Sequence, residues 1–117
     1  MEISDRFRGY LPVVVDLETG GFSKEDNPIL EVACSFITMR DDQLCIKNSA
    51  SWSLEPFEGS HIEPASLKIT GIDLDDPNRN AIDERDALIE FFKVVRDEMK
   101  FAGCHRAIMV AHNASFD

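Results

Sequence analysis

The sequence predicts an α/β domain with a mixed sheet, whose elements follow the order β-β-β-α-β. Three alternating or β-branched apolar runs come first, and an apolar repeat of 3.6 residues follows them. One further short apolar run comes after that repeat. A helix between two strands is the usual crossover to a parallel partner, so the last strand is expected to lie parallel to the first.

The first three strands are expected at residues 12–16, 29–39 and 46–54. The run Val13–Val15 is β-branched throughout, which is typical of a strand buried on both faces. In the second strand the even positions over 30–36 are apolar, which indicates one buried face. The third strand alternates from Ile46 to Leu54, as half-exposed or edge strands do. We expect these strands to pair as an antiparallel meander.

An amphipathic helix is the clearest element in the sequence. Between Leu88 and Ala102 the apolar side chains fall at helical spacing and form one stripe. Asp83 suits the N-cap position, and Gly103 suits the left-handed residue that ends a helix. The fourth strand is expected at 107–111, and the turn-rich segment before the helix has room for a short helix at 64–69.

Size, composition and charge limit the domain organisation, function and location that we expect for this chain. The sheet has one long helix to cover it, whereas sheets with a parallel core are covered on both faces, so we expect 1–117 to be a single partial domain. The net charge of −10 argues against a broad nucleic-acid coat, but not against an enzyme that binds one strand end at a metal site. No apolar run is long enough to cross a membrane, and the three scattered cysteines are typical of reduced thiols, so a cytoplasmic protein is expected.

Three carboxylates are candidate metal ligands. Asp16 and Glu18 stand two residues apart at the end of the first strand, where their side chains share a face. Neighbouring carboxylates repel unless a divalent cation holds them, and oxygen donors suit Mg²⁺ or Mn²⁺. Asp117 follows the fourth strand and would join them, because ligands bind at the carboxyl ends of parallel strands. Taken alone, an Asp-x-Glu before two glycines is more often a strand end and a turn.

Two motifs resemble those of the DEDD (DnaQ-like) 3′–5′ exonucleases. Asp16-Leu17-Glu18-Thr19 resembles the first motif of that family, and His112-Asn113-x-x-Phe116-Asp117 resembles the second. The similarity to the RNA-trimming branch covers nearly the whole chain. Its other matching segments are residues 5–9, 55–57, 71–73, 92–96 and 106–113. The resemblance implies a ribonuclease H-like fold, of which this chain is the β-β-β-α-β portion before the last strand and the C-terminal helices.

The resemblance also implies a phosphodiester hydrolase with two Mg²⁺ ions per complete site, for which Mn²⁺ can substitute. Asp16, Glu18 and Asp117 would be the catalytic metal ligands, and Glu18 would also orient the attacking water. The family's third motif supplies a His as general base and an Asp as fourth ligand, and residues 1–117 lack it. We therefore expect this chain to be inactive by itself.

The substrate implied by the resemblance is the 3′ end of RNA, as in the trimming of tRNA and other stable RNA precursors. Single-stranded DNA ends are also plausible. The family implies a homodimer as well. Two alternatives stay open: a proofreading-like exonuclease that acts on DNA, and a non-catalytic interaction module that kept a ribonuclease H-like sheet.

Further residues match family positions that contact nucleic acid. Phe22 and Phe116 match positions that stack on terminal bases. Where the family has a third aromatic residue this chain has Ile69, which can pack on a base but cannot stack on it. Thr19 and Gly20 would contact the terminal nucleotide through a hydroxyl and a backbone N–H. The expected contacts to RNA phosphates are the arginines Arg6, Arg8 and Arg106.

Overall fold

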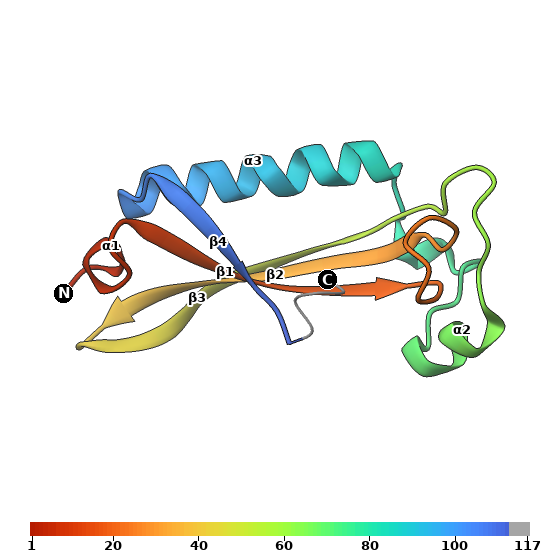
Figure 1. Ribbon diagram of the computed structural model, residues 1–117, viewed down its shortest axis with the longest axis horizontal. Coiled ribbons are helices and arrows are strands. Elements are labelled where there is room, and N and C mark those ends of the chain that lie inside the picture. The colour runs from red at the N-terminus through yellow and green to blue at the C-terminus, as the bar shows by residue number, and fades with distance from the viewer. Residues whose placement is uncertain (113–117) are drawn as a thin grey trace. The chain divides into compact units, whose positions relative to one another are not determined.

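The computed structural model describes residues 1–112, and its elements follow the predicted order (Figure 1). The helices and strands are α1 (Ile3–Arg6), β1 (Tyr10–Thr19), β2 (Ile29–Arg40), β3 (Gln43–Ser53), α2 (Pro64–Thr70), the 3₁₀ turn η1 (Pro77–Arg79), α3 (Glu84–Ala102) and β4 (Arg106–Val110). In the described part of the chain, none of the helices is both long and apolar enough to cross a membrane.

The strands form one sheet in the order β3-β2-β1-β4. β4 is parallel to β1, with Tyr10 opposite Arg106 and Val14 opposite Val110. This pairing confirms α3 as the crossover between two parallel strands. The turn Asp41–Asp42 joins β2 to β3, and its residues have φ angles of 52° and 60°. Positive φ at both positions is the type I′ geometry that matches the twist of an antiparallel hairpin.

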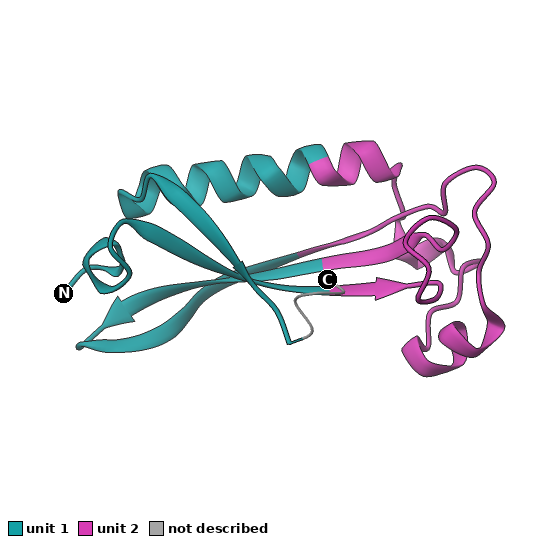
Figure 2. Ribbon diagram, viewed as in Figure 1, with its two compact units in different colours: residues 1–16, 33–50, 89–117 teal, residues 17–32, 51–88 magenta. Residues whose placement is uncertain are grey.

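The chain divides into two compact units (Figure 2). Unit 1 comprises residues 1–16, 33–50 and 89–117, and unit 2 comprises residues 17–32 and 51–88. The strands β1, β2 and β3 and the helix α3 each continue from one unit into the other, and the boundary in β1 falls directly after Asp16. The single partial domain expected over 1–117 stays a prediction.

Unit 1 is built around apolar side chains of the sheet and of α3. Leu11, Val13 and Phe36 are at most 2% exposed, and Phe91 and Val95 are 5% and 4% exposed. The two helical residues lie four positions apart on the predicted apolar stripe. Each fully buried side chain of this size contributes about 1.5–3 kcal/mol, so this packing is the main stabilisation of unit 1.

Unit 2 combines a smaller apolar core with hydrogen bonds to loop backbone. Leu30, Val32, Leu54 and Ala87 are at most 2% exposed. The guanidinium of Arg79 donates to the carbonyl of Leu30 at 3.3 Å and to that of Leu54 at 3.1 Å. This one side chain therefore ties the start of β2 to the residue that follows β3.

One burial prediction is wrong. Val14 was expected inside a strand buried on both faces, but it is 41% exposed. Successive strand residues point to opposite faces, so Val14 faces away from the side on which Val13 is fully buried. Ile46, on the apolar side of the third strand, is 69% exposed, because β3 is the outermost strand of the described sheet. The half-exposed character predicted for β3 is confirmed.

Candidate functional site

The predicted metal carboxylates come from two parts of the chain. Asp16 and Glu18 both lie in β1, where residues two apart share a face, and they are exposed and half-buried respectively. Asp117 and its neighbour Phe116 lie outside the described residues. Within residues 1–112, no group of three or more His, Cys, Asp or Glu side chains is placed to hold a metal ion. The donor set that is described, two carboxylates on one strand, has the oxygen chemistry that Mg²⁺ prefers.

The strand that precedes the second motif lies where the sequence places it. β4 is parallel to β1, and its last residue, Val110, is paired with Val14, two residues before Asp16. Parallel neighbours end at the same edge of a sheet, which is the arrangement that the predicted convergence of carboxylates requires. The position of Asp117 itself stays a prediction.

The loop after β1 carries Phe22, which is 87% exposed. Next to it, the Thr19 hydroxyl donates to the carbonyl of Gly21 at 2.7 Å, and the N–H of Gly20 donates to the carbonyl of Pro28 at 2.9 Å. The two groups expected to contact a nucleotide thus have partners inside the loop, and Gly20 is buried. Their nucleotide contacts stay a prediction, and the observed bonds show that both residues shape the loop.

A second segment of unit 2 is fastened to this loop. The N–H of His61 donates to the carbonyl of Asp26, and the N–H of Glu63 donates to the carbonyl of Gly20, both at 2.7 Å. This segment runs directly into α2, on which Ile69 is 82% exposed. The two described residues expected to contact bases in unit 2, Phe22 and Ile69, are therefore carried by segments that are bonded to each other.

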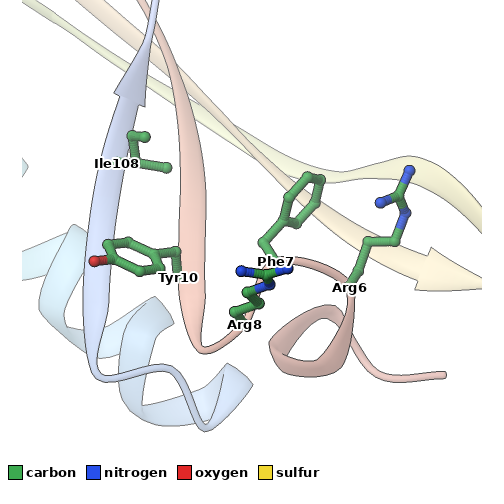
Figure 3. Close-up of a pocket in the computed structure, with 5 residues that line it drawn as sticks. All are labelled: Arg6, Phe7, Arg8, Tyr10 and Ile108. Atoms are coloured by element: carbon green, nitrogen blue, oxygen red, sulfur yellow. The ribbon is translucent and has the colours of Figure 1, made fainter.

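Unit 1 contains a pocket of about 340 Å³ that two of the predicted phosphate ligands line. Figure 3 shows Tyr10 and Ile108 on neighbouring strands, Arg6 at the end of α1, and Phe7 and Arg8 in the turn before β1. The third arginine, Arg106, is the β4 residue paired with Tyr10, so all three arginines gather at one end of the β1–β4 pair. The ion pairs found within residues 1–112 involve other residues than these three arginines.

The aromatic residues of this pocket, Phe7 and Tyr10, were not predicted from the sequence as binding residues. The Arg6 guanidinium carbon lies 5.1 Å from the centre of the Phe7 ring, and Tyr10 completes the aromatic lining. The signal was available, because residues 6–10 read Arg-Phe-Arg-Gly-Tyr, with two arginines and two aromatic residues in five positions. That composition is typical of sites that bind a phosphate backbone and stack bases.

The turn that presents this pocket is fixed by a close approach at Gly9. Its φ is +86°, and a Cβ at this position would collide with the imidazole of His105. The N–H of His105 donates to the Gly9 carbonyl at 3.0 Å, and its ring lies 5.9 Å from that of Tyr10. His105 therefore has a structural role in unit 1.

The remaining reactive groups show no arrangement for catalysis among the described residues. Burial raises the pKa of the thiols of Cys34 and Cys104. At Cys34 a backbone hydrogen bond with Ala50 lowers the pKa and the carboxylate of Glu98 raises it, and the net shift is upward. Both stay neutral thiols at neutral pH, so neither is an activated nucleophile. His61 forms an exposed pair with Glu63 at 3.2 Å.

Similarity to known proteins extends along nearly the whole chain. The sequence profile of a family described as exonucleases matches residues 13–117. Two curated relatives named ribonuclease T come from Shewanella sp. (strain W3-18-1) and Shewanella frigidimarina (strain NCIMB 400). They are 45% identical over 99% of this chain and 48% identical over 96% of it. The chain spans about half the length of these relatives, 52% and 51%.

Solved structures show the same fold. Exonuclease I of E. coli in complex with a dT13 oligonucleotide matches 89% of this chain and 20% of its own, with a TM-score of 0.64 and 14% identity. The nuclease domain of 3′hExo, a DEDDh family member bound to rAMP, matches 91% of this chain and 53% of its own, with a TM-score of 0.58 and 15% identity. These likenesses confirm the predicted α/β, ribonuclease H-like mixed sheet.

Proposed function

The chain belongs to the exonuclease family, and on that premise we propose that the complete protein is a 3′–5′ exoribonuclease. The observation that carries the proposal is the 45–48% identity to relatives named ribonuclease T over nearly all of the chain. The proposed substrates are the 3′ ends of tRNA and other stable RNA precursors. A DNA-acting exonuclease and a non-catalytic module are the outcomes against which the proposal is tested.

In this proposal Asp16, Glu18 and Asp117 hold two Mg²⁺ ions, for which Mn²⁺ can substitute. Bound cations of this kind activate water and stabilise the leaving oxygen of a phosphodiester. Asp16 and Glu18 support the proposal because they stand on one face of β1, beside a parallel neighbour. Glu18 would also orient the attacking water through its carboxylate.

In this proposal the other predicted residues bind the RNA strand. Phe22, Ile69 and Phe116 would contact the terminal bases, with Thr19 and Gly20 beside them. Arg6, Arg8 and Arg106 would bind phosphates at the unit 1 pocket. The aromatic lining of that pocket supports binding of RNA there, because base stacking on aromatic rings is worth about 1–3 kcal/mol per base.

The assembly and location are part of the proposal. We propose a cytoplasmic homodimer in which the unit 1 pocket of one subunit, lined by Arg6 and Arg8, guides RNA to the metal site of the other subunit. The three cysteines are free, as expected in a reducing compartment. Sedimentation of the complete protein at tens of micromolar tests the assembly, and a single monomeric species would contradict it.

The activity is tested on the complete protein with an RNA oligonucleotide and a DNA oligonucleotide of the same sequence, in Mg²⁺. We expect the RNA to be shortened from its 3′ end, and Asp16→Asn to slow this at least about 100-fold, because a site that lacks one metal ligand loses several kcal/mol of charge stabilisation. Asp42→Asn is the matched control, since it makes the same change at an exposed turn of unit 1.

Three results would overturn the proposal. They are no hydrolysis of either oligonucleotide, faster hydrolysis of DNA than of RNA, and full activity of Asp16→Asn. A calorimetric Mn²⁺ titration of residues 1–117 alone adds an independent readout. We expect binding without hydrolysis, and loss of that binding in Asp16→Asn.

A further inference from the structure

Asn27 is a buried amide that the proposed chemistry leaves without a role. Among residues 1–112 it is the one buried polar or charged residue, at 9% exposed. Its Oδ1 accepts from the N–H of Ser23 at 2.8 Å, and its Nδ2 donates to the carbonyl of His61 at 2.6 Å. Both ends of the amide are thus engaged, and their partners lie in different segments of unit 2.

One end of the amide organises the loop that carries Phe22. Both chain neighbours of Phe22 contact Asn27. The Ser23 N–H is bonded to its Oδ1, and a Cβ on Gly21 would collide with the same amide. The N–H of Asn27 also donates back to the Ser23 carbonyl at 2.8 Å. The exposed ring of Phe22 therefore projects from a short arc that is closed around the Asn27 side chain.

The other end of the amide fastens the segment that leads into α2. His61 is 34 positions away from Asn27 in the sequence, and two backbone bonds flank the amide contact. These are the bonds from His61 to Asp26 and from Glu63 to Gly20. We call the residues Gly20, Asp26, Asn27, His61 and Glu63 the loop clamp.

We propose that Asn27 is a positioning residue, which acts through Phe22 and fixes the segment before Ile69 for binding of the terminal bases. This inference rests on the proposed function. Asn27 itself is buried and does not touch the substrate. The clamp acts on the contacts to bases and not on the carboxylates. Its loss should therefore weaken binding of the RNA 3′ end more than it slows hydrolysis of the bound RNA.

The test is steady-state kinetics of the complete protein on a short single-stranded RNA. We expect Asn27→Ala to raise KM about 10-fold, which is the loss of roughly one stacked base, while kcat changes less than about twofold. Asn78→Ala is the matched control, an exposed residue of the same type in unit 2, and it should leave both constants unchanged.

A double-variant cycle separates positioning from general destabilisation. Phe22→Ala alone should raise KM by a similar factor, and adding Asn27→Ala to it should raise KM little further, because both remove the same contact. Independent, multiplying effects would overturn the proposal, as would an unchanged KM in Asn27→Ala. If Asn27→Ala does not fold, Asn27→Asp carries the test, because it keeps the acceptor for Ser23 and removes the donor to His61.

Failure of the inference differs from failure of the proposed function. If the wild-type protein does not hydrolyse RNA, the proposed function fails, and the clamp can still be read by hydrogen exchange. The amides of His61 and Glu63 should exchange at least about 10-fold faster in the Asn27 variants than in the wild type and in Asn78→Ala. Equal exchange would overturn the clamp even in an active enzyme.

Discussion

Unit 1 is held mainly by apolar side chains that meet across strands and helix, whereas unit 2 depends more on hydrogen bonds to loop backbone. In unit 1, Phe36 and Phe91 are at most 5% exposed within a packed core. In unit 2, Asn27 and Arg79 donate to carbonyls of segments distant in the sequence. The pocket of unit 1 is therefore supported by a packed apolar core, whereas the position of the Phe22 loop depends on a few polar side chains.

The largest effect is expected at a glycine of unit 1 that lies against a side chain. Gly9→Ala should lower the free energy of unfolding by about 3 kcal/mol, because a left-handed φ and a collision with His105 act together. Gly59→Ala is the control, since Gly59 has φ +82° but nothing within 4 Å of the place that a Cβ would take. It should lose about 1 kcal/mol in the same urea titration. Equal losses at the two glycines would show that packing at Gly9 adds nothing.

The stability of unit 2 should depend on the side chain of Arg79. Arg79→Ala should cost about 2 kcal/mol of unfolding free energy, because the carbonyls of Leu30 and Leu54 both lose a charged donor. Arg85→Ala, an exposed arginine at the start of α3, should cost under about 0.5 kcal/mol. If urea midpoints of the two variants agree, unit 2 does not depend on this hydrogen-bonding side chain.

Phosphate binding at the pocket of unit 1 should be visible in the salt dependence of RNA affinity. Replacing Arg6, Arg8 and Arg106 together by Ala should flatten the slope of log affinity against log salt by about 2, since each phosphate contact to a single strand contributes about 0.7. As a control, Arg40, Arg85 and Arg96 are replaced together by Ala, which removes the same charge at other positions. The measurement is RNA binding by the complete protein between about 50 and 200 mM salt, and matching slopes would show that the pocket does not bind phosphates.

The smallest effect is expected from a polar contact within unit 1. Lys47 Nζ lies 2.6 Å from Glu98 Oε2 and 3.8 Å from the centre of the Phe101 ring. A double-mutant cycle on Lys47 and Glu98 should give a coupling of about 1 kcal/mol, because the pair is partly buried. The pair Lys93–Asp97 is 69% and 61% exposed and should give about 0.3 kcal/mol. Couplings in the reverse order would mean that burial does not set the strength of these pairs.

Much of the fold follows from local patterns. The apolar spacing before Gly103 located α3, and the alternation over 30–36 located the buried face of β2, because side-chain periodicity is a property of the backbone of each element. Burial was harder to predict. Val14 and Ile46 are apolar and exposed because exposure depends on which element covers a strand, and that is decided between elements.

The candidate site divides in the same way. The spacing of Asp16 and Glu18 indicated a strand end as readily as a metal site, and it was the resemblance of the surrounding motif that pointed to the exonuclease family, which is confirmed. The loop clamp and the approach of Gly9 to His105 gave no signal, because each joins residues that are far apart in the sequence. A single sequence carries no record of such pairs.

By itself the sequence determined the order of the elements, the parallel crossover and the family, because periodicity, turn chemistry and short motifs are local. The tertiary structure alone decided that Arg106 lies opposite Tyr10, at the end of the sheet that Arg6 and Arg8 precede. It also decided that one buried amide joins the Phe22 loop to the segment before α2. The physical reason is that hydrogen bonds and close contacts form between whichever groups the folded chain brings within reach, whatever their separation along it.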